Sequence, residues 1–245
     1  MIEKTSPVEY LYVKALIKKI IKSKNVYNIF PESGIIFIHI PKTGGTSVKK
    51  LLLNLKNPEL SFYDKVKYYY FEEIKRKNLL SRHGKAVEYL NFFENDIWRD
   101  SLKFTCVRNP WDLMVSSYHW WIQHGHKFSK LNKMYTDISK MSFNEYMHSK
   151  YGKEMINECS GNAQDWFLND SKKIIVDGVI KLENFNFEFK ELLDKSNKKL
   201  NGDINLSKEN TTIREKYQTY YNKNTKQIIN DRFKFLIEYC NYKFD

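Results

Sequence analysis

One segment near the N-terminus constrains the fold of this chain more than any other. It begins with an apolar run from Ile35 to Ile40, which contains one histidine and is typical of a buried strand. A glycine-containing loop, residues 41–47, follows directly. Beyond the loop, apolar residues recur at the spacing of one helix face, namely Val48, Leu51, Leu52 and Leu55. The segment therefore predicts a strand, a loop and a helix in succession, as in an α/β fold.

The loop between this strand and this helix has the features of an anion-binding site. The first N–H groups of a helix lack partners within it, and the positive end of the helix dipole faces the loop. Gly44 and Gly45 let an anion approach the backbone, and Lys42 adds a mobile positive charge. Thr46 and Ser47 fall in the first turn, where their hydroxyls either bind the ligand or cap the helix. We expect a group that carries phosphate or sulfate to bind here.

A second apolar strand, Leu102 to Val107, ends in a turn of similar character. Arg108 opens that turn with a planar, permanently charged fork that suits phosphate, although an ion pair with Asp112 is the alternative. Ser116 adds a hydroxyl about two turns along the helix that follows. Ligands of an open parallel sheet bind beyond the carboxyl ends of its strands. The two turns together therefore predict a nucleotide with two separated anionic groups.

The length of the chain, 245 residues, suffices for one sizeable α/β domain, and no linker or repeat divides it. We predict a single domain over residues 1–245, in which residues 1–30 form a helical extension. Ser6 and Glu9 resemble a capping box, with Pro7 between them, and introduce an amphipathic helix through about Lys22. This helix either packs on the domain or contacts an anionic membrane.

Charge and cysteine content narrow the partners and the compartment. The formal charge of +12 favours anionic partners, or it reflects lysines scattered over a solvated surface. No nucleic-acid-binding motif accompanies it, so we expect no nucleic acid as partner. The three cysteines lack the spacing of a metal site, and no apolar run reaches the ~18 residues that span a bilayer. We expect a cytoplasmic protein in a reducing compartment, without a stable membrane anchor. The sequence gives no indication of oligomeric state.

The two turns also carry a family resemblance. Residues 41–47 resemble the 5′-phosphosulfate loop of sulfotransferases that use 3′-phosphoadenosine 5′-phosphosulfate (PAPS), and residues 108–116 resemble their 3′-phosphate site. The order of HIPKTGGTS and FVRNPWDR..S.Y is similar to that in the carbohydrate (heparan/chondroitin-type) branch. The chain also resembles later sequence segments of that branch, in residues 164–168, 177–185 and 217–244. Leu113 departs from the pattern, because the family usually has arginine there.

This resemblance implies a fold, a donor and roles for the two turns. The fold is a P-loop-like three-layer α/β arrangement with a central parallel β-sheet flanked by helices. PAPS is the sulfuryl donor, and no metal is implied. Lys42 stabilises charge on the departing phosphate, and the loop residues that share in binding the 5′ end are Thr43, Gly44, Gly45, Thr46 and Ser47. Arg108 and Ser116 bind the 3′-phosphate.

A base is needed to take the proton of the acceptor hydroxyl, and the sequence leaves its identity open. His83 matches an "H..A" element upstream of the second strand in relatives, but it is alternatively a loop or cap histidine. Glu183 follows a third apolar run, where it is another candidate base or cofactor contact, or caps the next helix.

Two further groups of residues have possible contacts with cofactor or acceptor. Asn210, Thr212 and Arg214, with Thr211, precede a C-terminal helix and, by resemblance, close over the nucleotide, or they cap that helix. Tyr118 and Trp121, with Trp120, either stack on a sugar or belong to the core.

The sequence thus predicts a PAPS-dependent sulfotransferase (EC 2.8.2 type) whose acceptor is a hydroxyl-bearing molecule, with a carbohydrate favoured by the resemblance. One alternative is a nucleotide kinase or NTPase with a degenerate P-loop, although the loop lacks the G-x-x-x-x-G-K-[ST] order. The other alternative is a non-catalytic nucleic-acid-binding protein, which the charge and the aromatic residues suggest.

Overall fold

A computed structural model describes residues 28–61, 64–65, 83–92, 95–127, 132–157, 160–207 and 213–245. The expected N-terminal helix lies outside these residues, as do Asn210, Thr211 and Thr212. No helix among the described residues is both long and apolar enough to cross a membrane.

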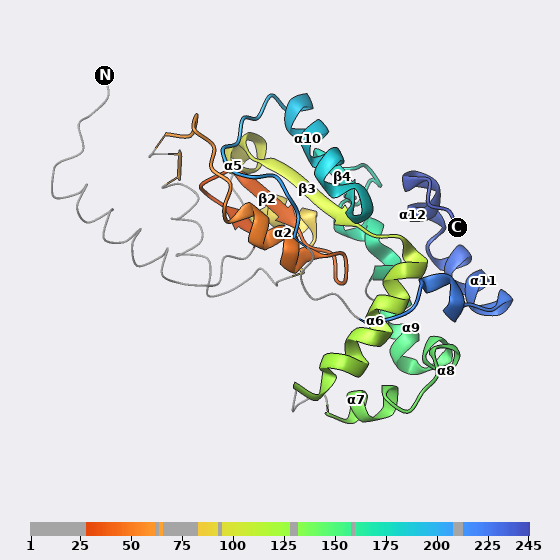
Figure 1. Ribbon diagram of the computed structural model, residues 1–245. Coiled ribbons are helices and arrows are strands. Elements are labelled where there is room, and N and C mark those ends of the chain that lie inside the picture. Colours follow the sequence, from red (N-terminus) through yellow and green to blue (C-terminus); the bar gives the residue numbers. More distant parts are fainter. Residues whose placement is uncertain are drawn as a thin grey trace, which may run out of the picture.

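A four-stranded sheet forms the centre of the molecule (Figure 1), with strand order β1-β2-β3-β4. The strands are β1 (Ile29–Phe30), β2 (Ile35–Ile38), β3 (Leu102–Val107) and β4 (Gly178–Lys181). β2, β3 and β4 are parallel, which confirms the strands predicted from the three apolar runs. The expected central parallel sheet is present in these three strands, and the sheet as a whole is mostly parallel, because β1 pairs with β2 in the antiparallel sense. The short turn before β2, with Gly34 at φ 67°, allows this hairpin.

Helices cover both faces of the sheet because alternate side chains of the buried strands point to opposite faces. On one face, Phe37 and Phe104 pack with α2 (Gly45–Leu52) and α10 (Phe185–Lys195). On the other face, Ile38 and Val107 join a larger cluster that includes α6 (Pro110–His124). The chain is therefore a mixed α/β fold with a mostly parallel sheet between helical layers.

The helix predicted after the first loop is confirmed, although it ends at Leu52. Leu55 lies beyond this end but is fully buried in the hydrophobic cluster that contains Phe37 and Phe104. Among the described residues, the other helices are α4 (Ala86–Phe92), α5 (Asn95–Asp100), α7 (Asn132–Ile138), α8 (Phe143–His148), α9 (Lys150–Asn157), α11 (Lys223–Arg232) and α12 (Lys234–Cys240). The 3-10 segments there are η1 (Gly125–Lys127), η3 (Ser160–Trp166), which has a kink at Asn162, η4 (Leu182–Asn184) and η5 (Tyr217–Tyr220).

Both β2 and β3 run directly into the elements that carry the predicted site. β2 ends at Ile38 and leads through the loop into α2, and β3 leads through a two-residue turn into α6. Figure 1 shows α6 continuing from the end of β3 and extending away from the sheet, and α7 and α8 pack against it. Because β2 and β3 are parallel neighbours, the two turns lie at the same edge of the sheet.

The C-terminal segment packs back onto the start of α6. The Tyr221 hydroxyl donates to the Trp111 carbonyl oxygen over 2.8 Å. The Phe244 ring lies edge-on to Trp111, with centroids 5.5 Å apart. These contacts fix η5 and the last residues of the chain beside the turn that follows β3.

Candidate active site

The loop after β2 turns sharply into α2 through two residues with positive φ. Lys42 has φ 66° and Gly44 has φ 80°, and Gly44 is the N-cap of α2. The Thr43 hydroxyl donates to the Ile40 carbonyl oxygen at 2.9 Å, which holds the turn closed. Thr46 and Ser47 lie in the first turn of α2, as predicted, but neither caps the helix. The α2 N-terminus therefore directs its first N–H groups at this loop.

Gly45 is required by the packing beneath the loop. A Cβ atom at this position would lie 1.8 Å from Nε2 of His39, which is only 4% exposed. His39 comes one residue after β2 and stacks on Phe37, with ring centroids 5.6 Å apart. The imidazole ring thus supports the loop from below, and no side chain at Gly45 fits above it.

The Lys42 side chain turns toward α6. Its Nζ lies 4.4 Å from the centroid of the Trp120 ring, a cation–π contact. Trp120 also stacks on His124, with centroids 5.9 Å apart. Lys42 keeps part of its surface exposed, yet burial of the amine, together with the nearby Arg108 charge, lowers its pKa from 10.5 to about 7. The amine is thus close to its titration point at neutral pH.

Arg108 joins the two predicted anion-binding turns. Its Nη1 donates to Oγ of Ser116 over 2.9 Å and approaches the carbonyl oxygen of Lys42 at 3.4 Å. Lys42 and Arg108 are 66 positions apart in the sequence. The structure therefore brings together Lys42, Arg108 and Ser116, which the sequence nominated separately.

The ion pair that was the alternative for Arg108 is also present. Nε and Nη2 of Arg108 contact Oδ2 of Asp112 at 2.7 and 2.5 Å. The other oxygen of Asp112 accepts a hydrogen bond from Nη2 of Arg214, at 2.6 Å. Arg214 was expected near the site only by resemblance, and spacing along the chain gave no signal that Asp112 would connect it to Arg108.

Glu183 lies at the same edge of the sheet, two residues after the end of β4 and within η4. One carboxylate oxygen accepts the backbone N–H of Asn109 at 2.8 Å, and the other accepts the Tyr242 hydroxyl at 3.1 Å. Burial raises the pKa of Glu183 above its usual value, and the hydrogen bond from Asn109 opposes that shift. Glu183 does not cap α10, whose N-cap is Asn184. It ties the ends of β3 and β4 to the C-terminal segment.

His83 lies beside the loop, packed on His39. The two rings are 4.5 Å apart between centroids, and Nδ1 of His83 is 3.0 Å from the carbonyl oxygen of His39. A carbonyl oxygen only accepts hydrogen bonds, so Nδ1 carries the proton and the neutral ring has its lone pair at Nε2. The carbonyl oxygen of His83 in turn accepts the indole N–H of Trp166, at 3.0 Å.

The aromatic residues of α6 differ in placement. Tyr118 is 8% exposed, and its hydroxyl donates to the Met141 carbonyl oxygen at 2.6 Å, so it occupies the core. Trp121 is partly buried against the same cluster. Trp120 is engaged by Lys42 and His124. Sequence reasoning placed these three residues in one group, whereas the structure places Trp120 against the loop lysine and Tyr118 in the core.

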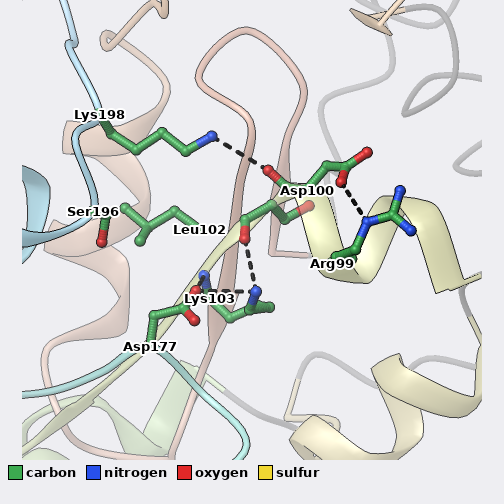
Figure 2. Close-up of a pocket in the computed structure, with 8 residues that line it drawn as sticks. Arg99, Asp100, Leu102, Lys103, Asp177, Ser196 and Lys198 are labelled. Carbon is green, nitrogen blue, oxygen red and sulfur yellow. Dashed lines mark hydrogen bonds and ion pairs between the residues drawn. The ribbon is translucent and has the colours of Figure 1, made fainter.

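A separate polar cleft of about 510 Å³ lies at the opposite, amino-terminal end of the sheet (Figure 2). Lys103 is 8% exposed there, and its Nζ contacts Oδ2 of Asp177 at 3.1 Å and the carbonyl oxygens of Trp98 and Ser101 at 3.1 and 2.9 Å. These acceptors satisfy the ammonium group. No residue predicted for the site lines this cleft.

Among the residues that the structure describes, no group of three or more His, Cys, Asp or Glu side chains is placed to hold a metal ion. A family model described as the sulfotransferase family matches residues 25–243, nearly the whole chain. No curated protein and no solved structure matches the chain significantly.

Proposed function

The chain belongs to the sulfotransferase family, and from this premise we propose that it transfers a sulfuryl group from PAPS to a hydroxyl group of a carbohydrate. PAPS supplies a sulfuryl group whose bond to the 5′-phosphate oxygen breaks as the acceptor oxygen bonds to sulfur. The products are the sulfate ester and adenosine 3′,5′-bisphosphate. The proton of the acceptor hydroxyl passes to a base on the protein.

The contact of Arg108 with both Lys42 and Ser116 carries this proposal. PAPS has an anionic group at each end of its ribose, so its site needs two anion-binding elements side by side. The α2 N-terminus with its loop is suited to the 5′ end in the manner of a P-loop, and Arg108 with Ser116 is suited to the 3′-phosphate. The residues present therefore fit the donor.

Lys42 is suited to stabilise the departing phosphate. Charge accumulates on the bridging oxygen as the sulfuryl group leaves, and a positioned ammonium group lowers the energy of that state. The pKa of about 7 leaves this amine only partly protonated near neutrality. An anionic donor beside it raises that pKa again, because an opposite charge favours the protonated form. Binding of the donor thus supplies the charge state that the reaction needs.

His83 is the base that the geometry favours over Glu183. With its Nδ1 proton directed at the His39 carbonyl oxygen, the neutral His83 ring has its lone pair at Nε2, the form that accepts a proton. Glu183 has a structural role instead, because both oxygens of its carboxylate accept hydrogen bonds that tie the turn after β3 to the C-terminal segment.

The carbohydrate acceptor rests on the sequence resemblance. The structure offers half-buried aromatic and histidine side chains along the second half of α6, near Lys42. We propose that this surface receives the acceptor. A cytoplasmic location is likewise a proposal, consistent with two buried free thiols, Cys106 and Cys240.

Calorimetric titration with adenosine 3′,5′-bisphosphate, 5′-AMP and ATP with Mg²⁺ tests the donor site without any acceptor. We expect tight binding of the bisphosphate that depends on its 3′-phosphate and needs no metal. Replacement of Arg108 by Ala should weaken that binding by about 2 kcal/mol or more, because a charged hydrogen-bonding partner is lost. Arg99→Ala, which removes an exposed arginine at the other end of the sheet, is the matched control.

Two results would contradict the proposal. Preference for ATP with Mg²⁺ would favour a kinase, and failure to bind any of the three nucleotides would remove the donor site. If the bisphosphate binds, incubation with ³⁵S-labelled PAPS and a panel of glycans identifies the acceptor. Transfer to non-carbohydrate hydroxyls alone would contradict the carbohydrate part of the proposal.

A further inference from the structure

Asp112 is a counter-ion shared by two arginines from distant parts of the chain. Arg108 precedes it by four positions, whereas Arg214 follows it by 102 positions. All three side chains are largely buried, with exposed fractions of 17% for Arg108, 20% for Asp112 and 13% for Arg214. Ion pairs in such partly buried positions are screened less by salt than pairs on the surface.

The contacts of Asp112 determine which way Arg108 points. Oδ2 of Asp112 accepts from Nε and Nη2, and thus holds one edge of the planar guanidinium group. The remaining nitrogen, Nη1, is thereby directed at Ser116 and at the loop carbonyl oxygen of Lys42. A guanidinium group is rigid and planar, so fixing one edge fixes the direction of the other donors.

The second oxygen of Asp112 brings Arg214 to the same place. Two guanidinium groups that contact one carboxylate lie within several ångströms of each other and would repel without it. With Asp112 between them, the three side chains carry a net charge of +1, beside the Lys42 amine. This arrangement keeps positive charge for a ligand while it offsets the repulsion between the arginines.

The segment that carries Arg214 is attached to α6 at a second point. The Ile213 carbonyl oxygen accepts a hydrogen bond from Nε2 of Gln123, at 2.8 Å. Asp112 and Arg214 also line an open cleft of about 610 Å³, together with residues 215–218 and Asp245. The cleft has the size typical of small-molecule sites, and Arg214 is the member of the arginine pair that lines it.

We infer that Asp112 is a positioning residue that holds Arg108 and Arg214 together as one receptor for the 3′-phosphate of the nucleotide. The inference rests on the proposed function. The role of Asp112 is to orient the Arg108 fork and to anchor the Arg214 segment. A carboxylate in the first turn of α6 also stabilises this helix, because its negative charge interacts favourably with the helix dipole. The test must therefore separate the positioning of the arginines from the stability of the helix.

The test uses Asp112→Asn, which keeps the shape and removes the charge, and Asp112→Glu, which keeps the charge. Asp231→Asn, at an exposed aspartate of α11, controls for the change in net charge. Calorimetry at fixed salt compares adenosine 3′,5′-bisphosphate with 5′-AMP. We expect Asp112→Asn to lower the affinity for the bisphosphate about tenfold or more and to leave the affinity for 5′-AMP unchanged. Asp112→Glu should restore part of the loss, and Asp231→Asn should have no effect.

A double-mutant cycle with Arg214→Gln tests whether Asp112 acts through Arg214. If it does, the double variant binds the bisphosphate more tightly than the sum of the two single losses predicts. Amide hydrogen exchange gives a readout that needs no ligand: Asp112→Asn should speed exchange in residues 213–221 more than in the rest of α6 and the sheet.

The inference is overturned, while the proposed function stands, if Asp112→Asn weakens the binding of both nucleotides by the same factor. It is likewise overturned if the ratio of the two affinities stays as in the unaltered protein. If the unaltered protein binds neither nucleotide, the proposed function fails, and the exchange measurement alone decides whether Asp112 positions the segment. Unchanged exchange in residues 213–221 would then overturn the positioning role as well.

Discussion

At the scale of single residues, the loop after β2 depends on a match between a glycine and the ring below it. Gly45 lies against Nε2 of His39, at a distance that admits no Cβ atom. His39 is in turn packed between Phe37 and His83. The loop conformation therefore follows from a buried imidazole as much as from the flexibility of glycine.

Substitution of Gly45 by Ala should destabilise the protein by about 2 kcal/mol, because an added methyl group must displace a packed ring. Thermal denaturation followed by circular dichroism measures the loss. Gly45→Ala should cost less stability in the His39→Ala background than in the unaltered protein, because the ring that clashes is gone. Lys50→Ala, on the exposed side of α2, is the control. A Gly45→Ala variant as stable as the unaltered protein would show that the ring moves aside freely.

The Lys42 amine should make stability depend on pH. Its pKa is 10.5 in an ordinary environment and about 7 in the fold. Between these values the unfolded chain binds more protons than the folded one, so this residue's contribution to stability falls as pH decreases from 10.5 toward 7. Lys42→Met removes the titrating group. Urea unfolding at pH 7 and pH 9 should therefore show that Lys42→Met gains more, relative to the unaltered protein, at pH 7. An identical difference at both pH values would contradict the lowered pKa.

At the scale of elements, α6 serves both as scaffold and as carrier of the site. Oδ1 of Asn109 accepts the backbone N–H groups of Trp111 and Asp112, each at 3.1 Å, and Pro110 occupies the first helical position. The cap thus sets where α6 begins. Because Asp112 and Ser116 lie on its first two turns, the cap also sets where the arginine contacts form.

Asn109→Ala should lower stability by about 1 kcal/mol through loss of the cap. It should also weaken the binding of adenosine 3′,5′-bisphosphate. Asn222→Ala is a matched control, since Oδ1 of Asn222 caps α11 by accepting the backbone N–H of Thr225. Chemical denaturation should show a loss in both variants, whereas calorimetry should show weaker binding only for Asn109→Ala. Equal affinity in the two variants would mean that the α6 cap does not position the site.

The sequence predicted the elements whose hydrophobic pattern can be recognised within a short stretch of consecutive residues. β2, β3 and β4 are short apolar runs followed by turn residues, and α2 has a clear apolar face. β1 has only two residues, too few for any period to be visible. The helices α7, α8 and α9 were not predicted, and their packing depends on partners elsewhere in the chain.

The candidate site, like the fold, was predicted only in part. Lys42, Arg108 and Ser116 each follow or begin an element that the sequence reveals, and strand adjacency brings them together. The Asp112–Arg214 pair depends instead on how a segment 102 positions away folds back on α6. The contact of Lys42 with Trp120 depends on side-chain direction. Local spacing carries no information about either.

At the scale of the whole molecule, residues 242–244 pack beside the candidate site. Phe244 packs edge-on to Trp111, Tyr217 and Tyr221, and Nζ of Lys226 lies 3.9 Å from its ring centroid. Tyr242 donates to Glu183 nearby. One aromatic ring thereby connects the start of α6, the turn η5 and α11.

Phe244→Ala should lower stability by about 2 kcal/mol, less than for a fully buried phenylalanine because the ring is only partly buried. It should also loosen η5, and hydrogen exchange should rise in residues 217–221. Phe187→Ala is the control, since Phe187 is 66% exposed on α10. A similar small effect in both variants would show that the Phe244 ring does not hold these elements together.

The distance along the chain between Asn109 and Lys243, whose atoms meet at the site, is 134 positions. At about 5–20 residues per second, a ribosome needs roughly 7 to 27 seconds to cover that interval. During this time β2 and β3 have been made, but the carbonyl oxygen of Lys243 and the ring of Phe244 have not. Until those residues are made, the turn after β3 lacks the contacts that later hold it, and the start of α6 depends on local interactions such as the Asn109 cap.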